Sequence, residues 1–350
     1  MKRVGHLYEK FMTEENFILA EKLIGKNKPD NEMAQKIKNN AELYGKALHQ
    51  EVQIHGIVFA KNREIDIVDS YRGKVRHLKI PCLKDQAIQQ AWLNIATPIL
   101  IKRNYYFNCA CIPRAGQIRS VKALQKWLRN PKNKYGAVTD IRKFYDSIPH
   151  SLVIKNLRRI IKDERFIKVA QKILDNMSET GVGIAIGHPS SHWFANVALM
   201  HLDHECKRLF PRVKFTRYAD DIAFVSANKR QLCNCIRYLR EELAKEGMSV
   251  KMWQYFLVED RGLRFLSYRF FHRYTMLVKK LMVRIARKMK QASLHMNIKT
   301  ARSVMSYYGI LKHCNSYHFR QLRVYPFIDF KRTRRLISIH DKMQFCRETA

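Results

Sequence analysis

The spacing of apolar residues divides this chain of 350 residues into three parts. From Leu7 to Leu48, apolar residues recur every three or four positions, and this spacing predicts helices up to about residue 50. In the middle of the chain, short runs of β-branched and aromatic residues predict strands that meet at tight turns. After residue 272 the helical spacing of Met, Leu and Ile returns. We therefore expect a strand-rich centre between helical ends.

The same spacing predicts the individual elements of the centre. Strands are expected where β-forming residues alternate or cluster, at 52–60, 64–70, 75–80, 105–112, 215–225, 248–258 and 262–270. Helices are expected where apolar residues share a helical repeat, at 84–93, 116–128, 150–177, 190–206 and 229–247. Glycines and a proline mark a loop just before the helix at 190–206, where Ser190 or Ser191 could be the N-cap. The backbone of such a loop can approach a ligand closely.

Charge narrows the choice of partner. The chain carries 66 Lys and Arg against 30 Asp and Glu, a formal net charge of +36. Solubility does not need so large an excess, which therefore indicates a polyanionic partner, nucleic acid above all. We find no apolar run near the ~18 residues of a membrane span, no signal peptide and no lipidation motif. The expectation is a cytoplasmic, nucleic-acid-binding protein with no membrane partner.

The eight cysteines are expected to stay reduced in such a protein. Two pairs, Cys109 with Cys111 and Cys233 with Cys235, are separated by one residue, whereas zinc sites use two to four. No histidine pair at finger spacing lies beside them. We interpret these cysteines as small packing residues rather than metal ligands.

Two adjacent acids, Asp220 and Asp221, lie between apolar runs that predict two strands and a tight turn. Like charges at a hairpin tip repel, and a divalent cation removes that cost. The alternative is a solvated turn, because Asp is common in turns. A third acid, Asp140, ends the apolar run that starts at Tyr135. Three carboxylates on two neighbouring strands would give the oxygen-rich site that two Mg²⁺ ions need.

These segments resemble the motifs of reverse transcriptases. Tyr218-Ala219-Asp220-Asp221 matches the Tyr-x-Asp-Asp signature of motif C, and Asp140 followed five positions later by Tyr145 is similar to motif A. The loop and helix at 181–199 resemble motif B, and 262–270 resembles the primer grip of motif E. The resemblance implies an α+β, right-hand polymerase fold with fingers, a palm built on an antiparallel sheet, and a helical thumb.

The resemblance also implies domain boundaries over almost the whole chain. Residues 1–50 would be a helical lead-in, 51–134 the fingers, 135–271 the palm and 272–350 the thumb, with part of the fingers interleaved in the palm. Motif A would be 135–148, motif B 181–199, motif C 215–225 and motif E 262–270. From residue 273 onward the chain holds 18 Lys and Arg against 3 Asp and Glu, which makes the expected thumb strongly basic.

Among reverse transcriptases, the chain looks most like those of diversity-generating retroelements. Residues 1–10 and 306–317 are similar to the ends of that family, and its Trp-Gln pair is present as Trp253 and Gln254. His192 stands where that family usually has Gln, which weakens this assignment and leaves room for the related bacterial reverse transcriptases of antiphage defence. His192 itself is either a satisfied histidine at a helix start or a titrating group, and we expect the former.

Site roles follow from the resemblance. Asp140 and Asp220 would bridge two Mg²⁺ ions, which Mn²⁺ could replace, with Asp221 and the Ile141 carbonyl completing the shell. The nucleotide would meet Lys74, Arg76, Tyr145, Ile186 and Gly187. Primer and template would be supported by Tyr218, Ser191, His192 and Gly262. The alternative for the basic hairpin that carries Lys74, Arg76 and Lys79 is a solvated strand face.

The expected activity is RNA-directed DNA synthesis, in which a bacterial or phage non-coding or template RNA is copied into cDNA. The partners would be that RNA, the RNA–DNA heteroduplex and dNTPs, and an accessory protein or a second copy of the chain are further candidates. A template-independent or protein-primed DNA polymerase of an antiphage system is an alternative that keeps the same three acids. A structured-RNA-binding protein without catalysis is an alternative of another class.

Overall fold

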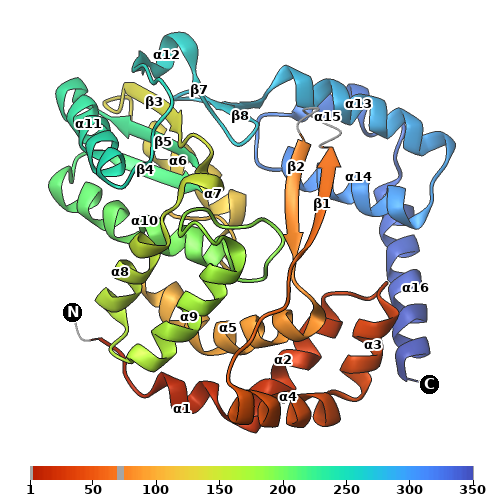
Figure 1. The fold of residues 1–350 in the computed structure, drawn as a ribbon. Coiled ribbons are helices and arrows are strands. Elements are labelled where there is room, and N and C mark those ends of the chain that lie inside the picture. The colour runs from red at the N-terminus through yellow and green to blue at the C-terminus, as the bar shows by residue number, and fades with distance from the viewer. Residues whose placement is uncertain (1–2, 69–74, 350) are drawn as a thin grey trace.

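The computed structural model describes residues 3–68 and 75–349, with side chains described as far as residue 343. Four helices at the N-terminus form the base of the molecule in Figure 1, α1 (Leu7–Phe11), α2 (Glu14–Lys26), α3 (Glu32–Asn39) and α4 (Ala41–His55). The long helix α5 (Leu83–Arg103) packs against α1 and α2. Buried side chains such as Phe11, Phe17 and Trp92 fill the space between these helices. The helices expected from the sequence up to about residue 50 are thus present.

An antiparallel hairpin of β1 (Arg63–Val68) and β2 (Val75–Ile80) rises from this base toward the C-terminal helices (Figure 1). The strand expected at 75–80 is confirmed, and β1 covers most of the one expected at 64–70. The strand expected at 52–60 is wrong, because α4 continues to His55 and ends at Gly56, whose φ of 71° lies in the left-handed region that favours glycine.

The central sheet has four antiparallel strands in the order β4-β5-β3-β6, namely β4 (Lys214–Tyr218), β5 (Asp221–Ser226), β3 (Tyr135–Asp140) and β6 (Phe256–Leu257). Side chains of β5 alternate between two hydrophobic cores. Ile222 and Phe224 belong to the first core, whereas Ala223 and Val225 belong to the second. Because successive residues of a strand point to opposite faces, the sheet is the wall between the two cores.

Helices cover the face of the sheet that belongs to the first core, α8 (His150–Ile160), α9 (Glu164–Met177), α10 (Ser191–Leu209) and α11 (Lys229–Lys245). The single helix expected at 150–177 is two helices. Chain segments that meet in the fold explain the break, because the Asp163 carboxylate accepts hydrogen bonds from the backbone N–H groups of Leu7 at 2.8 Å and Tyr8 at 2.9 Å. The same carboxylate caps α9 through Phe166.

The opposite face carries α6 (Gly116–Leu128) and a second sheet of β7 (Leu263–Phe265), β8 (Tyr268–Phe270) and β9 (Thr275–Leu277). The short helix α12 (Val258–Arg261) leads into β7. The hairpin expected at 262–270 is confirmed and gains a third strand. The remaining helices pack on the same core, α13 (Lys279–Leu294), α14 (Ile298–Leu311), α15 (Tyr317–Arg323) and α16 (Phe330–Thr349).

Two segments expected as strands are mostly irregular. Within 105–112, only Asn108 forms an isolated bridge, to Arg217 of β4, and within 248–258 only Val250 forms one, to Ile141, besides the short β6. Their β-forming residues serve packing instead, since Tyr105 and Val250 are both buried in the first core. Cys109 is buried as expected of a packing residue, whereas Cys111 is exposed.

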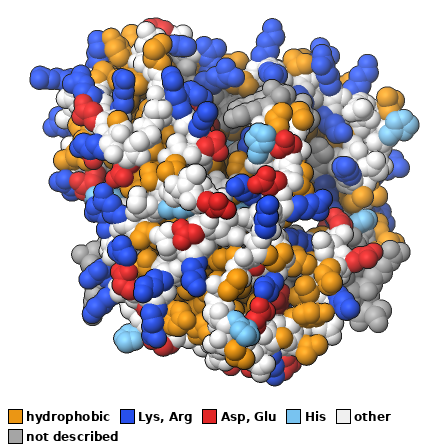
Figure 2. Space-filling view, in the orientation of Figure 1, with side chains coloured by type: hydrophobic (Ala, Val, Ile, Leu, Met, Phe, Trp, Pro, Cys, Tyr) orange, Lys and Arg blue, Asp and Glu red, His pale blue; other side chains and the backbone are white. Residues whose placement is uncertain are grey.

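Helices and antiparallel sheets thus follow the order expected from the sequence, and the α+β fold class is confirmed. Figure 2 shows Lys and Arg side chains spread over this whole face of the molecule, including the part that covers α13.

Candidate active site

The register of the central sheet brings the three predicted acids together. Asp140 at the end of β3 is paired with Asp221 at the start of β5, and Asp221 is also paired with Tyr218 at the end of β4. Ala219 and Asp220 form the two-residue turn between β4 and β5. The backbone N–H of Ile141 donates to the carbonyl of Asp220 at 3.2 Å, which ties β3 to that turn.

The two carboxylate oxygens of Asp140 have different surroundings. Its Oδ1 is buried and, among the described residues, receives no hydrogen bond, whereas its Oδ2 forms an ion pair with the Lys251 ammonium. The backbone N–H of Lys251 also donates to the Asp140 carbonyl at 2.9 Å. Sequence reasoning missed Lys251, because it lies in the irregular stretch after α11, which pairs with Ile141 through Val250. The available signal was a basic residue in the β-forming stretch that follows α11.

The donor chemistry at this end of the sheet fits a divalent cation. Mg²⁺ and Mn²⁺ prefer carboxylate and carbonyl oxygens, and Asp140 offers a buried oxygen while its other oxygen already attracts a positive charge. Over residues 3–68 and 75–349, no three His, Cys, Asp or Glu side chains are gathered closely enough to hold an ion as they stand. The acids are neighbours in the backbone, and their side chains would turn to share an ion. The metal site stays a prediction.

The two tyrosines of the predicted site flank the acids. Tyr145 lies in the short helix α7 (Phe144–Ser147), directly after β3, and its ring contacts that of Phe144 with centroids 5.5 Å apart. Burial, with the nearby Asp220 carboxylate, raises the pKa of Tyr145 to about 12. Tyr218 is half-buried and packs against the second core. The Tyr145 hydroxyl therefore stays protonated near neutral pH.

The glycine-containing loop at 181–190 runs beside the α7 segment. The backbone N–H groups of Gly183 and Ile184 donate to the carbonyls of Ile148 at 2.9 Å and Tyr145 at 2.7 Å. Gly183 has a φ of 98°, a conformation that side chains with a Cβ rarely adopt. The loop and the α7 segment were both predicted from the sequence, and these two backbone hydrogen bonds hold them together in the structure.

The far end of this loop contacts β2. The Ile186 carbonyl accepts a hydrogen bond from the Lys79 backbone N–H at 2.9 Å, and a Cβ at Gly187 would lie 2.5 Å from the Lys79 carbonyl oxygen. Only glycine permits so close an approach at a φ of 123°. Ile186 is half-buried, so its side chain remains available at the surface of the loop.

Buried polar residues anchor the start of α10. Gln89 of α5 accepts a hydrogen bond from the Ser190 hydroxyl at 2.9 Å, and its amide nitrogen contacts Nδ1 of His188 at 2.9 Å. Ser190 therefore occupies the N-cap position without a capping side chain, and the Ser191 hydroxyl donates to the Ala185 carbonyl. Burial, and to a lesser extent the charge of Lys79, lowers the pKa of His188 to about 4. Burial also lowers the pKa of His192, which favours the neutral form of the ring.

Comparison with known proteins identifies the family. Residues 61–270 match the reverse transcriptase (RNA-dependent DNA polymerase) family, a region that includes the hairpin, the acids, the glycine-containing loop and the strands β7 and β8. The chain belongs to the reverse transcriptase family.

The individual proteins that resemble this reverse transcriptase share little sequence identity with it. Protein YkfC of Escherichia coli K12 is 29% identical over 105 residues, which is 29% of this chain and 28% of YkfC. Telomerase from Candida tropicalis aligns with a TM-score of 0.48 at 12% identity, over 80% of this chain and 65% of that one. Telomerase from Candida albicans, solved with a fragment of telomeric RNA, gives 0.46 at 11% identity, over 83% and 64%. The chain therefore spans under a third of YkfC and under two thirds of either telomerase chain.

The remaining predicted residues of this reverse transcriptase lie on the hairpin and near the second sheet. Lys74 lies outside the described residues, and Arg76 is exposed on β2. Lys79 of the same strand donates to the Met177 carbonyl at 3.3 Å, so it faces α9. Gly262 ends α12 with a φ of 67°, and a Cβ there would lie 2.6 Å from the Phe271 ring. Gly262 thus serves close packing of the β7–β8 hairpin.

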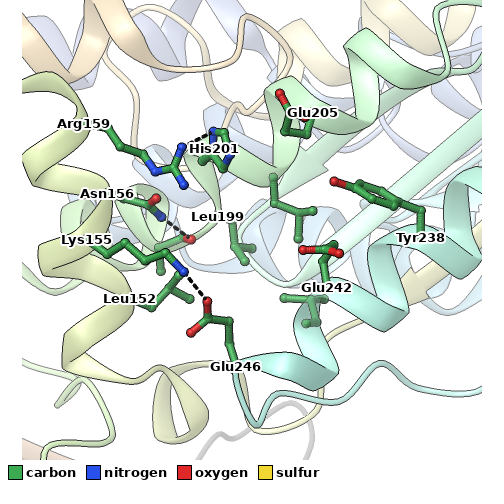
Figure 3. Close-up of a pocket in the computed structure, with 13 residues that line it drawn as sticks. Leu152, Lys155, Asn156, Arg159, Leu199, His201, Glu205, Tyr238, Glu242 and Glu246 are labelled. Carbon is green, nitrogen blue, oxygen red and sulfur yellow. Dashed lines mark hydrogen bonds and ion pairs between the residues drawn. The ribbon is translucent and has the colours of Figure 1, made fainter.

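A hollow of about 150 Å³ on the reverse transcriptase lies between α8, α10 and α11, and its charged groups are largely paired with one another (Figure 3). Lys155 pairs with Glu246 at 3.0 Å, and Arg159 contacts His201 at 3.3 Å. No predicted site residue lines it.

In the part of the chain that the structure describes, no helix is both long and apolar enough to cross a membrane.

Proposed function

We propose that this protein is an RNA-templated DNA polymerase whose catalytic centre is formed by Asp140, Asp220 and Asp221. The pairing of Asp140 with Asp221 beside the Asp220 turn, in a chain of the reverse transcriptase family, is the observation that carries the proposal. Asp140 and Asp220 would bind both metal ions, with Asp221 and the Ile141 carbonyl completing the set. Bound Mg²⁺ or Mn²⁺ would supply activation of the primer 3′-hydroxyl and charge neutralisation at the triphosphate.

The other residues would position substrates. Arg76, with Lys74, would approach the β- and γ-phosphates from the hairpin, and the backbone around Ile186 and Gly187 would face the nucleotide. Tyr145 would stack under the deoxyribose. Support for the primer and template would come from Tyr218, Ser191, His192 and Gly262. In this assignment 1–50 is a lead-in, 51–134 the fingers, 135–271 the palm and 272–350 the thumb.

We further propose a bacterial or phage non-coding RNA as the template, in a diversity-generating retroelement or in antiphage defence. The likeness of residues 1–10 and 306–317 to the ends of retroelement enzymes supports the first setting, and His192 in place of the usual Gln leaves room for the second. An accessory protein or a second copy of the chain are candidate partners in both settings.

Primer extension tests the proposed activity. The purified protein should add dNTPs to a primer annealed to RNA when Mg²⁺ or Mn²⁺ is present, and a chelator should stop the reaction. Omitting the RNA template separates the main proposal from its closest alternative. Equal incorporation without RNA would favour a template-independent or protein-primed polymerase, and no incorporation with tight RNA binding would favour a non-catalytic RNA-binding protein.

Sugar selectivity should depend on the Tyr145 ring. Tyr145→Ala removes the bulk that would meet a 2′-hydroxyl, so rNTP use relative to dNTP use should rise roughly tenfold or more. Tyr145→Phe is the matched control, because it keeps the ring and loses only the hydroxyl, and it should select like the parent. Ratios of kcat/KM for dNTP and rNTP measure the effect. An unchanged ratio in Tyr145→Ala would assign the ring to packing against Phe144.

Base selectivity should depend on Ile186, since an aliphatic side chain offers no hydrogen bond to the incoming nucleotide. A missing polar contact of this kind is worth about 1–3 kcal/mol, or roughly ten- to a hundredfold in discrimination. We expect frequent errors with some bias to template adenines, and fewer errors in Ile186→Gln. Val182→Gln, a change at an exposed position of the same loop, is the control. Sequencing of cDNA from a defined RNA measures the rates, and equal, low error rates in parent and Ile186→Gln would reject the role.

A further inference from the structure

Arg217 of β4 precedes Tyr218 and the acids, and its side chain is completely buried. Its Nε lies 3.1 Å and 3.0 Å from the two carboxylate oxygens of Asp203, and its Nη2 lies 2.6 Å from Oδ2. The side-chain exposures of the pair are 0% and 2%. Burying two charges is costly, and apolar residues of similar volume commonly stabilise a core as well or better. A buried pair beside the acids therefore calls for a role other than stability.

The remaining guanidinium nitrogen reaches the turn that carries Asp220. Nη1 of Arg217 donates to the Ala219 carbonyl at 3.1 Å. Ala219 has a φ of 55°, in the left-handed region that a residue with a Cβ adopts only at a cost and when its surroundings hold it there. The Ala219 carbonyl and the Asp220 nitrogen belong to one planar peptide group. A fixed Ala219 carbonyl therefore fixes the plane of this peptide group, and with it the direction in which the Asp220 side chain leaves the backbone.

The other partners of Arg217 come from two further segments. Asn196 lies on α10 seven residues before Asp203, and its Oδ1 is 3.5 Å from Nη1 of Arg217 and accepts a hydrogen bond from Asn108 at 3.0 Å. The backbone of Arg217 is bonded on both sides to the 107–109 segment, at 2.9 Å in each bond. Because α10 begins at Ser191, this network connects the end of the glycine-containing loop with the turn of the acids.

We propose that Arg217, held by Asp203, is a positioning residue that orients the Ala219–Asp220 peptide for metal binding. It acts through the backbone and touches no substrate, and it links the nucleotide-facing loop to the acids through α10. The inference rests on the proposed function for its catalytic consequence, whereas its effect on metal affinity can be measured without any polymerase reaction.

The decisive variant replaces the pair by apolar residues, Arg217→Met together with Asp203→Leu. The core should remain filled, so the thermal unfolding midpoint and the affinity for RNA should stay close to those of the parent. Loss of the bond to Ala219 should raise the Kd for Mn²⁺, followed by electron paramagnetic resonance of the free ion, by about 10- to 100-fold. The kcat for dNTP addition should fall by a similar factor at a nearly unchanged KM.

The exposed pair of Arg158 on α8 with Glu164 on α9 provides a matched control, because it has the same two-pronged geometry, with contacts of 3.1–3.2 Å. Arg158→Met with Glu164→Leu should change none of these quantities. A folded Arg217→Met/Asp203→Leu protein with the parent's Mn²⁺ affinity and kcat would overturn the proposal.

If the apolar double variant does not fold, Arg217→Lys decides instead. A single ammonium can pair with Asp203 and cannot also reach the Ala219 carbonyl, so Mn²⁺ affinity should fall in a folded protein, and parental affinity would refute the positioning role. If the parent protein binds Mn²⁺ but makes no DNA, the proposed function is rejected. The role of Arg217 is then decided by comparing the Kd for Mn²⁺ of the parent with that of the Arg217 variants. A parent that binds no Mn²⁺ would reject both.

Discussion

Replacing Asp220 and Asp221 together by Asn should abolish template-directed dNTP incorporation. Divalent cations at a phosphoryl-transfer site lower the activation barrier by several kcal/mol, and each 1.36 kcal/mol is tenfold in rate, so their loss should slow incorporation by roughly 10³-fold or more. RNA affinity should stay the same or rise slightly, because two negative charges near the phosphates are removed. Primer extension and RNA binding measured on the same protein separate these effects.

A control with the same change of charge is available on α12. Glu259→Gln with Asp260→Asn removes two exposed acids that lie next to each other near the central sheet, and incorporation should remain at the parent's level. Parental incorporation by the Asp220→Asn, Asp221→Asn protein would refute the catalytic assignment. An equal loss in the α12 control would attribute the effect to net charge rather than to the site.

Binding to duplex or structured RNA should weaken by orders of magnitude between low and physiological salt. The chain has 18 Lys and Arg against 3 acids from residue 273 onward, and α13 presents Lys280, Arg284, Arg287 and Lys288 along one groove of about 430 Å³. Each phosphate neutralised releases counterions, so a protein with 6–10 such contacts loses roughly 10³- to 10⁵-fold in affinity between 50 and 200 mM salt.

Neutralising part of the groove tests where the RNA lies. Arg287→Gln with Lys288→Gln should lower the slope of log affinity against log salt by about two, since each phosphate contact contributes about 0.9. Arg158→Gln with Arg159→Gln on α8 is the control and should leave the slope unchanged. A flat salt response in the parent would mean that the basic C-terminal helices face away from RNA.

The acids and their strands could be predicted because the information is local. Asp220 and Asp221 lie between two apolar runs, and a two-residue connection between such runs leaves one geometry, which the pairing of Tyr218 with Asp221 confirms. The pairing of Asp140 with Asp221 followed from the motif resemblance. Helices with strong periodicity, such as 116–128, were predicted to the residue.

Contacts between distant segments could not be predicted. Lys251 meets Asp140 across 111 positions of sequence, through a stretch whose β-forming residues suggested a strand. The break in the helix expected at 150–177 depends on the Asp163 carboxylate accepting hydrogen bonds from the backbone of Leu7 and Tyr8, which are 156 and 155 positions away along the chain. The partner of Arg217 was hidden for a different reason: Asp203 is only 14 positions away, but a charged residue within an apolar strand pattern does not indicate which buried acid it meets.

The position of β5 between two cores has a consequence for how the molecule opens. Ile222 and Phe224 are covered from one side, and Ala223 and Val225 from the other, so an amide of this strand can exchange its hydrogen with solvent only when both coverings are breached. Amides on the N-terminal helices or on α13 need only one such event. We therefore expect the strand that begins with Asp221 to belong to the slowest-exchanging cooperative unit of the chain, which hydrogen exchange would measure. The outer helices could then open and close while this strand keeps its register.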